Sequence, residues 1–126
     1  MPKITASAPV LLVRDVVASA EYFRDAVGFK YDRLWGDPPD FCIAERDAHF
    51  LMLAQVTDAQ QIIPFWKIRD KMWNVYFWVD DADSLYEEMK AKGARIDYGP
   101  CTQPYDVREF GIQDLDGHDI GFGQGL

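Results

Sequence analysis

The feature that most constrains the fold is an internal repeat with a period of about half the chain. In the first copy, Asp15 follows an apolar run and precedes a helical pattern that ends at Gly28. In the second copy, Asp81 and Gly93 hold the same two positions. The aspartates lie 66 residues apart and the glycines 65. The repeat predicts two copies of one structural unit, neither of which buries its apolar surface alone.

Each copy has the pattern of a strand, an Asp cap, an amphipathic helix, a glycine stop and further strands. Pro9 to Val13 and Val75 to Val79 are β-branched and aromatic runs of strand length. An aspartate before a helix accepts hydrogen bonds from the free amides of its first turn, and glycine suits the left-handed position just past its end. Helical spacing predicts one apolar face per helix, formed by Val17, Ala20, Phe23 and Val27 in the first and by Ala82, Leu85, Met89 and the Lys92 stem in the second.

After each helix the pattern indicates three more strands. They are predicted over Phe29 to Trp35, Phe41 to Glu45 and His49 to Gln55, and over Ala94 to Tyr98, Val107 to Gln113 and His118 to Gly123. Asp114 to Gly117 is predicted as a tight hairpin turn in which Gly117 supplies a positive φ. The expected fold class is α+β. Two βαβββ modules, about residues 6–56 and 73–124 with a link over 57–72, are expected to pack into one domain of 126 residues.

Composition limits the partners. The net charge of -8 argues against nucleic acid, because an acidic surface repels phosphate backbones. Such a surface attracts cations, including basic drugs, although acidic surfaces also serve solubility alone. The two cysteines form no C-x-x-C pair, the start lacks the apolar run of a signal peptide, and no apolar stretch of about 18 residues occurs. We therefore expect a cytoplasmic protein with no membrane partner.

Several motifs in order resemble the vicinal oxygen chelate superfamily, which includes glyoxalase I, extradiol dioxygenases, fosfomycin-resistance enzymes and bleomycin-resistance binding proteins. The resemblance covers nearly the whole chain. It rests on the segments Val13-Arg14-Asp15-Val16, Glu21-Tyr22-Phe23-Arg24-Asp25-Ala26-Val27-Gly28-Phe29, Val79-Asp80-Asp81, Gly93, and Arg108-Glu109-Phe110-Gly111-Ile112-Gln113-Asp114-Leu115-Asp116-Gly117-His118. It implies an open, cup-shaped mixed sheet with helices outside. In metal-dependent members that cup holds a divalent ion on about four His or Glu side chains.

The resemblance places the four ligand positions of the family at Ala8, Asn74 and Gly121 and near Met52. Ala, Asn and Gly cannot supply an imidazole or anionic ligand set, so we expect no metal of the family type and no other cofactor. A displaced site on His49, Glu109, His118 or Asp119 stays an alternative. For both histidines, a surface or packing role is the simpler interpretation.

Strand alternation predicts which side chains line the cup. Asn74, Tyr76 and Trp78 share one face, and the apolar Val75, Phe77 and Val79 share the face toward the helices. Alternation also turns Glu109 into the cup, as a ligand, a base or a clamp for a cationic guest; a pair with Arg108 or another strand neighbour is the alternative. The predicted ligand-binding residues are Trp78, Tyr76, Trp35 and Trp66 as stacking walls, with Asn74 and Glu109 for polar orientation. Packing in the core or at a dimer interface is the alternative for each aromatic.

Motifs for nucleophilic catalysis and phosphate binding are absent from the sequence, so no catalytic residue is predicted. We expect a homodimeric, metal-independent binding protein of the bleomycin-resistance type. It would sequester a planar aromatic ligand, cationic in some cases, such as a bleomycin-type antibiotic. One alternative is a lyase, isomerase or dioxygenase with a displaced metal site on Glu109, His49 or His118. Another is a regulatory domain that uses the cup for a protein partner.

Overall fold

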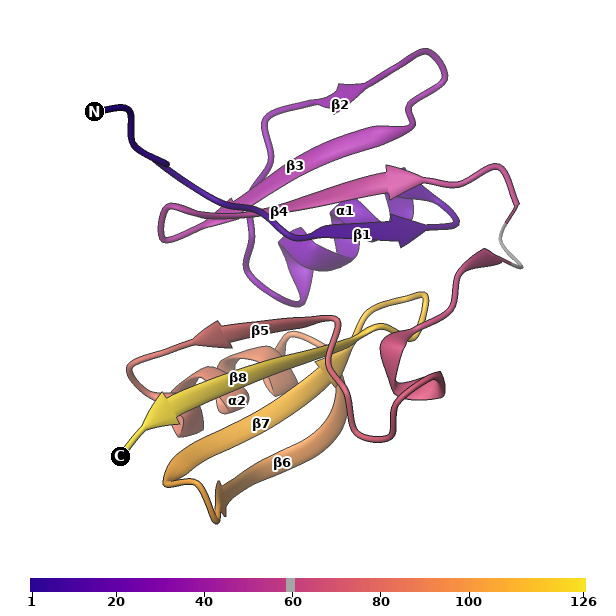
Figure 1. Cartoon of the computed structure of the whole chain (residues 1–126). Coiled ribbons are helices and arrows are strands. Elements are labelled where there is room, and N and C mark those ends of the chain that lie inside the picture. Colours follow the sequence, from indigo (N-terminus) through magenta and orange to yellow (C-terminus); the bar gives the residue numbers. More distant parts are fainter. Residues whose placement is uncertain (59–60) are drawn as a thin grey trace. The chain divides into compact units, whose positions relative to one another are not determined.

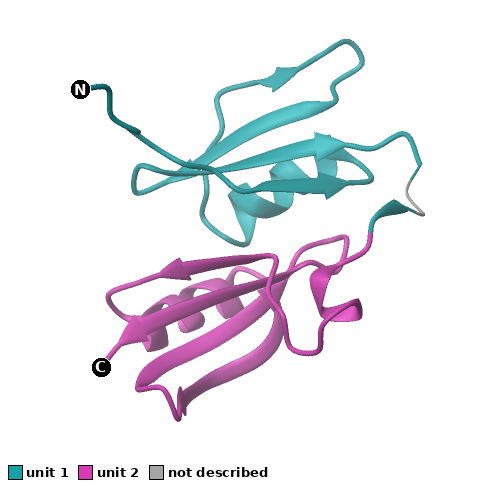
Figure 2. Ribbon diagram, in the orientation of Figure 1, with its two compact units in different colours: residues 1–62 teal, residues 63–126 magenta. Residues whose placement is uncertain are grey.

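A computed structural model describes residues 1–58 and 61–126, and it shows an α+β chain (Figure 1). The chain divides into two compact units, Met1–Ile62 and Ile63–Leu126 (Figure 2). Each unit has one α-helix and a four-stranded mixed sheet, which confirms the predicted fold class. The predicted link over 57–72 includes residues 59 and 60, which lie outside the described residues. In the described part of the chain, no helix is long and apolar enough to cross a membrane.

The first unit has the order strand, helix and three strands. Its sheet has the order β1-β4-β3-β2, in which β1 and β4 are parallel and the other pairs are antiparallel. The elements are β1 (Val10–Val13), α1 (Val16–Asp25), β2 (Leu34–Trp35), β3 (Phe41–Arg46) and β4 (His49–Gln55).

The second unit repeats this order. Its sheet is β5-β8-β7-β6, again with one parallel pair, β5 with β8. The two equal topologies confirm the paired βαβββ modules. The elements are β5 (Val75–Trp78), α2 (Ala82–Ala91), β6 (Arg95–Gln103), β7 (Val107–Gln113) and β8 (Asp119–Gly125), preceded by the short 3-10 helix η2 (Phe65–Lys67).

Both predicted helix caps and both glycine stops are confirmed. Asp15 accepts hydrogen bonds of 3.1 Å from the amides of Val17 and Ala18, and Asp81 accepts one of 3.1 Å from Ser84. These bonds satisfy amides that have no partner within the helix. Gly28 and Gly93 have φ values of 82° and 90°, the left-handed region that glycine adopts without a steric cost.

Three details of the prediction are wrong. The strand expected over Phe29 to Trp35 is reduced to β2, with one isolated bridge from Lys30 to Glu45, because this edge segment meets β3 only at its two ends. β6 runs to Gln103 instead of Tyr98, since two register shifts keep it paired along β7. On α1 and just past its end, Ala20, Phe23 and Val27 are buried as predicted, but Val17 is exposed and the buried face begins at Val16.

The core of the second unit lies between its sheet and α2. Phe77, Phe122 and Phe110 stack in a row with ring centroids 5.7 and 5.0 Å apart, and Tyr86 of α2 meets Phe110 edge to face at 5.6 Å. Phe77 therefore points toward the helix, as alternation predicted. The side chains of Tyr76 and Trp78, on either side of it, point to the opposite face of the sheet.

Candidate functional site

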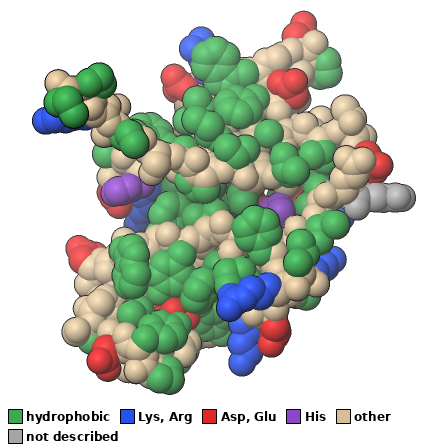
Figure 3. Space-filling model, viewed as in Figure 1, with side chains coloured by type: hydrophobic (Ala, Val, Ile, Leu, Met, Phe, Trp, Pro, Cys, Tyr) green, Lys and Arg blue, Asp and Glu red, His purple; other side chains and the backbone are tan. Residues whose placement is uncertain are grey.

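The candidate site is a group of polar and aromatic side chains on the face of the β5–β8 sheet that α2 does not cover. Its centre is Glu109, on β7, whose residue is only 1% exposed. Phe110 packs toward α2, so the neighbouring Glu109 projects to the other face. We call this group the Glu109 cluster; its members are Glu109, Trp73, Tyr76, Tyr98, Cys101, Gln103 and Tyr105. On the side drawn in Figure 3, hydrophobic side chains gather over this unit's sheet.

Four side-chain donors bind the Glu109 carboxylate. Oε1 accepts hydrogen bonds of 2.8 Å from the hydroxyls of both Tyr76 and Tyr105. Oε2 accepts one of 2.7 Å from the Tyr98 hydroxyl and one of 3.2 Å from Gln103 Nε2. Within the described residues, no Lys, Arg or His forms an ion pair with Glu109. The carboxylate is therefore solvated by neutral donors while its charge has no counter-ion, an arrangement that lowers the cost of burying a charge.

Glycines on β7 and β8 make room for the rings of the cluster. A Cβ atom on Gly111 would collide with the Tyr98 ring, and one on Gly121 would collide with Tyr76 and Trp73. A Cβ on Gly123 would collide with the hydroxyl end of Tyr76. The aromatic rings thus lie directly on the backbone of the sheet, which is a recognised role of glycine inside a strand.

The environment of the three tyrosines raises the pKa of each phenol above its usual value. Burial, followed by the hydrogen bond to Glu109, raises the pKa of Tyr105 to about 12. The same two causes, in the same order, raise the pKa of Tyr76 and of Tyr98 well above the usual phenol value. Each phenol therefore keeps the proton that it donates to Glu109.

An aromatic edge continues from the cluster toward solvent. Trp73 and Tyr76 meet edge to face with ring centroids 4.6 Å apart, and Tyr76 and Trp78 meet in the same way at 5.1 Å. Trp78 is 68% exposed, a high value for an indole. The indole of Trp73 donates a 3.0 Å hydrogen bond to the hydroxyl of Tyr98, which couples this edge to the cluster.

The remaining predicted residues lie elsewhere. Asn74 Oδ1 accepts a 3.0 Å hydrogen bond from the Phe65 amide, and Trp66 Nε1 donates one of 2.7 Å to the Gly117 carbonyl. Both side chains therefore fasten the segment around η2 to the rest of the second unit. Trp35 belongs to the first unit, where the Arg33 guanidinium lies 3.7 Å from its ring centroid.

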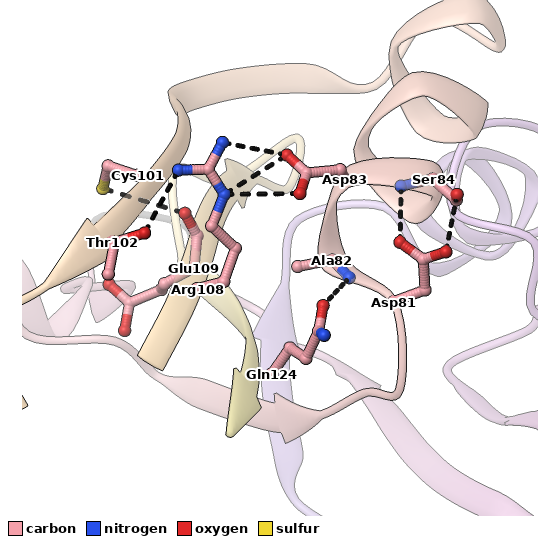
Figure 4. A network of polar contacts seen from close by, with 9 residues as sticks. All are labelled: Asp81, Ala82, Asp83, Ser84, Cys101, Thr102, Arg108, Glu109 and Gln124. Carbon is pink, nitrogen blue, oxygen red and sulfur yellow. Dashed lines mark hydrogen bonds and ion pairs between the residues drawn. The ribbon is translucent and has the colours of Figure 1, made fainter. Parts of the chain in front are cut away.

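The alternative of a pair between Glu109 and Arg108 is wrong, whereas the alternative of another strand neighbour agrees with the bonds from Tyr98 and Gln103 of β6. Arg108 points to the α2 side of the sheet, where its Nη2 lies 3.0 Å from Asp83 Oδ1 (Figure 4). Figure 4 also shows the Gln124 side chain, which accepts a hydrogen bond from the Ala82 amide beside the Asp81 cap at the start of α2. Adjacent residues on a strand face opposite sides, so Arg108 and Glu109 cannot share a partner.

Sequence reasoning missed five members of the cluster: Trp73, Tyr98, Cys101, Gln103 and Tyr105. Tyr98 was placed at the end of a strand that in fact continues to Gln103, with Tyr105 in the turn that follows. The signal that could have found them is the set of glycines inside β7 and β8, because a strand-interior glycine often marks the close approach of another group.

The described residues do not fit a metal centre. No group of three or more His, Cys, Asp or Glu side chains in residues 1–58 and 61–126 is arranged to hold an ion. Both oxygens of Glu109 are hydrogen-bonded, and Asp119 Oδ1 accepts from Gln113 at 2.9 Å. His118 is buried in the β7–β8 hairpin of the second unit, and His49 is exposed on β4 of the first. These donors do not supply the convergent ligand set that a divalent ion needs.

Comparisons with known proteins agree with this architecture. A family model described as Glyoxalase/Bleomycin resistance protein/Dioxygenase superfamily matches residues 5–122. The bleomycin-binding protein from bleomycin-producing Streptomyces verticillus, solved with copper(II)-bleomycin, is 28% identical with a TM-score of 0.71 over 100% of both chains. No curated protein sequence matches the chain significantly.

Two further solved structures share the fold at lower identity. TnmS3, an antibiotic binding protein from Streptomyces sp. CB03234, has a TM-score of 0.74 and 19% identity, over 100% of this chain and 99% of its own. A glyoxalase-related enzyme from Clostridium phytofermentans has a TM-score of 0.78 and 17% identity, over 99% and 98%. One of these relatives is described as a binding protein and the other as an enzyme, so the shared fold alone does not decide between the two functions.

Proposed function

We propose that this chain, which belongs to the Glyoxalase/Bleomycin resistance protein/Dioxygenase superfamily, is a metal-independent binding protein that sequesters a planar aromatic ligand. Bleomycin-type antibiotics, which are cationic, are the first candidates. Sequestration means that the ligand is held with no covalent bond made or broken, so neither a catalytic residue nor a cofactor is required.

The observation that carries the proposal is an exposed aromatic edge beside a buried carboxylate that has no counter-ion in residues 1–58 and 61–126. Trp78 and Tyr76 offer ring surfaces, and a stacked aromatic ligand gains about 0.5–1.5 kcal/mol per ring contact beyond simple burial. Behind them, Glu109 contributes a negative charge that ring contacts alone do not provide. Flat apolar walls with a few fixed polar groups are the usual composition of a small-molecule site.

The comparisons support the same choice. The Streptomyces verticillus protein, which matches this chain over its full length, is described as bleomycin-binding, and TnmS3 is described as antibiotic binding. The chemistry of the cluster agrees with binding rather than catalysis. A reacting group would reach either oxygen of Glu109 only by displacing a phenol or the Gln103 amide.

The remaining expectations are also part of this proposal. The protein would act in the cytoplasm as a homodimer, without nucleic acid or a membrane as a partner. The net charge of -8 supports the exclusion of nucleic acid, since such a surface repels phosphates. In the second unit, Trp66 and Asn74 stay proposed ligand contacts together with Trp78, Tyr76 and Glu109, and Trp35 of the first unit stays a separate prediction.

Isothermal titration calorimetry with metal-free bleomycin tests the proposal. We expect saturable heat with one ligand bound per chain and a dissociation constant in the micromolar range or below. The titration is repeated after treatment of the protein with a chelator, and binding should be unchanged because no metal takes part. Absence of binding heat at millimolar bleomycin, and with a panel of planar aromatic compounds, would falsify the proposed function.

A further inference from the structure

We infer that the Glu109 cluster is a surface of hydrogen-bond acceptors that selects planar aromatic ligands bearing a protonated amine or guanidinium group and rejects anionic ones. This inference deepens the proposed function and rests on it. It names the charge of the ligand and the atoms that sense this charge. The direction of each polar proton in the cluster decides which ligand groups the cluster can bind.

The donor protons of the cluster are directed inward. The hydroxyls of Tyr76, Tyr98 and Tyr105 all donate to Glu109, because an ionised carboxylate accepts hydrogen bonds and offers no proton. Gln103 donates its two amide protons to Glu109 Oε2, at 3.2 Å, and to Cys101 Sγ, at 3.3 Å.

Trp73 and Cys101, which do not contact the Glu109 carboxylate, also donate their polar protons within the cluster. The Trp73 indole donates its one proton to the hydroxyl of Tyr98 at 3.0 Å. The Cys101 thiol lies 3.8 Å from the Glu109 carbonyl and donates to it. Every polar hydrogen of the seven side chains is therefore already bound within the cluster.

The groups of the cluster that stay available to a ligand are hydrogen-bond acceptors and aromatic ring faces. A phenol oxygen that donates its own proton keeps lone pairs that accept from another group. The hydroxyl oxygens of Tyr76 and Tyr105 each have this capacity, since both donate to Oε1 of Glu109. The ring faces of Trp73, Tyr76 and Trp78 carry negative quadrupoles that attract cations. Among the seven side chains of the cluster, a carboxylate or phosphate on the ligand would meet acceptors and no donor.

The charge of Glu109 acts in the same direction. The carboxylate is buried and has no ionic partner among the described residues, so solvent and salt screen its field weakly. A cation bound at the Tyr105 hydroxyl oxygen would be separated from the Glu109 carboxylate by that hydroxyl group alone. Tyr105 is 55% exposed and is the most exposed of the three phenols, so the oxygen of Tyr105 is where a ligand first reaches the cluster.

The test uses three acridines that differ in charge and share one planar ring system. At slightly alkaline pH 9-aminoacridine is a cation, acridine is neutral, and acridine-9-carboxylate is an anion. We expect calorimetry to show that the unmodified protein binds the cation at least about tenfold more tightly than acridine, a difference of about 1.4 kcal/mol. The anion should bind more weakly than acridine. This series uses only the unmodified protein, so it tests the charge preference even if a substituted variant fails to fold.

Glu109→Gln then assigns the preference to this carboxylate. A glutamine donates its amide protons toward the phenols, so at least one phenol proton turns outward and the negative charge is lost. The preference for the cation over acridine should fall from about tenfold to less than about threefold. The matched control is Glu87→Gln on the exposed side of α2, which removes the same charge from the same unit and should keep the preference.

Each result has one meaning. Equal binding of the cation and acridine by the unmodified protein, tighter binding of the anion, or an unchanged preference in a folded Glu109→Gln variant overturns the inference. Failure to bind 9-aminoacridine by a protein that does bind bleomycin also overturns it, because the ligand class would be wrong. Failure to bind bleomycin and all three acridines refutes the proposed function itself.

Discussion

The hydroxyl of Tyr76 donates a 2.8 Å hydrogen bond to Glu109 across a strand that contains neither residue. Tyr76 is on β5 and Glu109 is on β7, and β8 lies between them in the sheet. The ring crosses β8 above Gly123, the residue that pairs with Glu109 on one side and with Trp78 on the other. The bond exists because β8 has no side chain at that point.

Gly123→Ala should therefore break this bond. The new Cβ would occupy the space of the Tyr76 hydroxyl and displace the ring, while the backbone of β8 stays as it is. We expect the free energy of unfolding to fall by about 1–3 kcal/mol, the usual cost of losing a hydrogen bond to a buried charged group. Affinity for bleomycin should fall about tenfold.

Gly125→Ala is the matched control, because the same change on the same strand meets no atom within 4 Å. Denaturant unfolding and calorimetry should show a change of less than about 0.5 kcal/mol for this variant. Equal effects of the two substitutions would mean that strand flexibility, and not the Tyr76 ring, is responsible.

Trp78→Ala should separate binding from stability. The side chain is 68% exposed, so its removal should cost little folding free energy, less than about 1 kcal/mol. If Trp78 stacks on the ligand, affinity should fall at least tenfold, as at other exposed aromatic anchors. Trp78→Phe keeps a ring and should retain most of the affinity. A folded Trp78→Ala variant that binds bleomycin as tightly as the parent protein would remove Trp78 from the site.

Alkaline titration should reveal the phenols of the cluster. The pKa of Tyr105 is raised to about 12 by burial and by its bond to Glu109, so the folded state favours the protonated phenol. The stability that this preference contributes is fully present below about pH 10, the usual phenol pKa, and is lost as the pH rises through about 12. The ultraviolet difference between the parent protein and Tyr105→Phe should show one phenol that ionises near pH 12. Ionisation near pH 10 would contradict the hydrogen bond.

The free energy of unfolding should also depend on pH through Asp114, whose pKa is raised in the folded protein. Burial, partly offset by His118, raises the pKa of this carboxyl to about 6. Because the folded value exceeds the unfolded one of about 3.9, the stability linked to Asp114 is fully present below about pH 4 and is lost as the pH rises through 6.

The check on Asp114 is Asp114→Asn, which keeps an Oδ1 acceptor for the amides of Asp116 and His118 and removes the charge. Relative to the parent protein, the variant should gain stability between pH 4 and pH 7 in denaturant unfolding. A difference between the two proteins that does not vary with pH would show that Asp114 ionises as freely in the folded state as in the unfolded chain.

Metal analysis provides the last prediction. The purified protein, before and after exposure to zinc, nickel, manganese and iron(II), should hold no stoichiometric divalent ion, because the family's ligand positions carry Ala8, Met52, Asn74 and Gly121. One tightly bound ion per chain would overturn this expectation and would make a displaced site on Glu109, His49 or His118 the working model.

The sequence by itself determined the repeated architecture of the chain, because the signals involved are local. A cap depends on an aspartate and an amide two or three residues later, as at Asp15 and Asp81. The face that Tyr76 presents follows from the two-residue period of a strand and from nothing distant. Repetition of these signals then indicated two modules, and Glu109 was assigned to the correct face in the same way.

Only the tertiary structure decided which groups surround Glu109. Tyr76, Tyr98 and Tyr105 come from a strand two places away, from a strand with two register shifts and from the turn after it. Register shifts and ring positions depend on long-range packing, which local periodicity does not encode. The three glycines below the rings show the same limit, since their function is defined by side chains that approach from other strands.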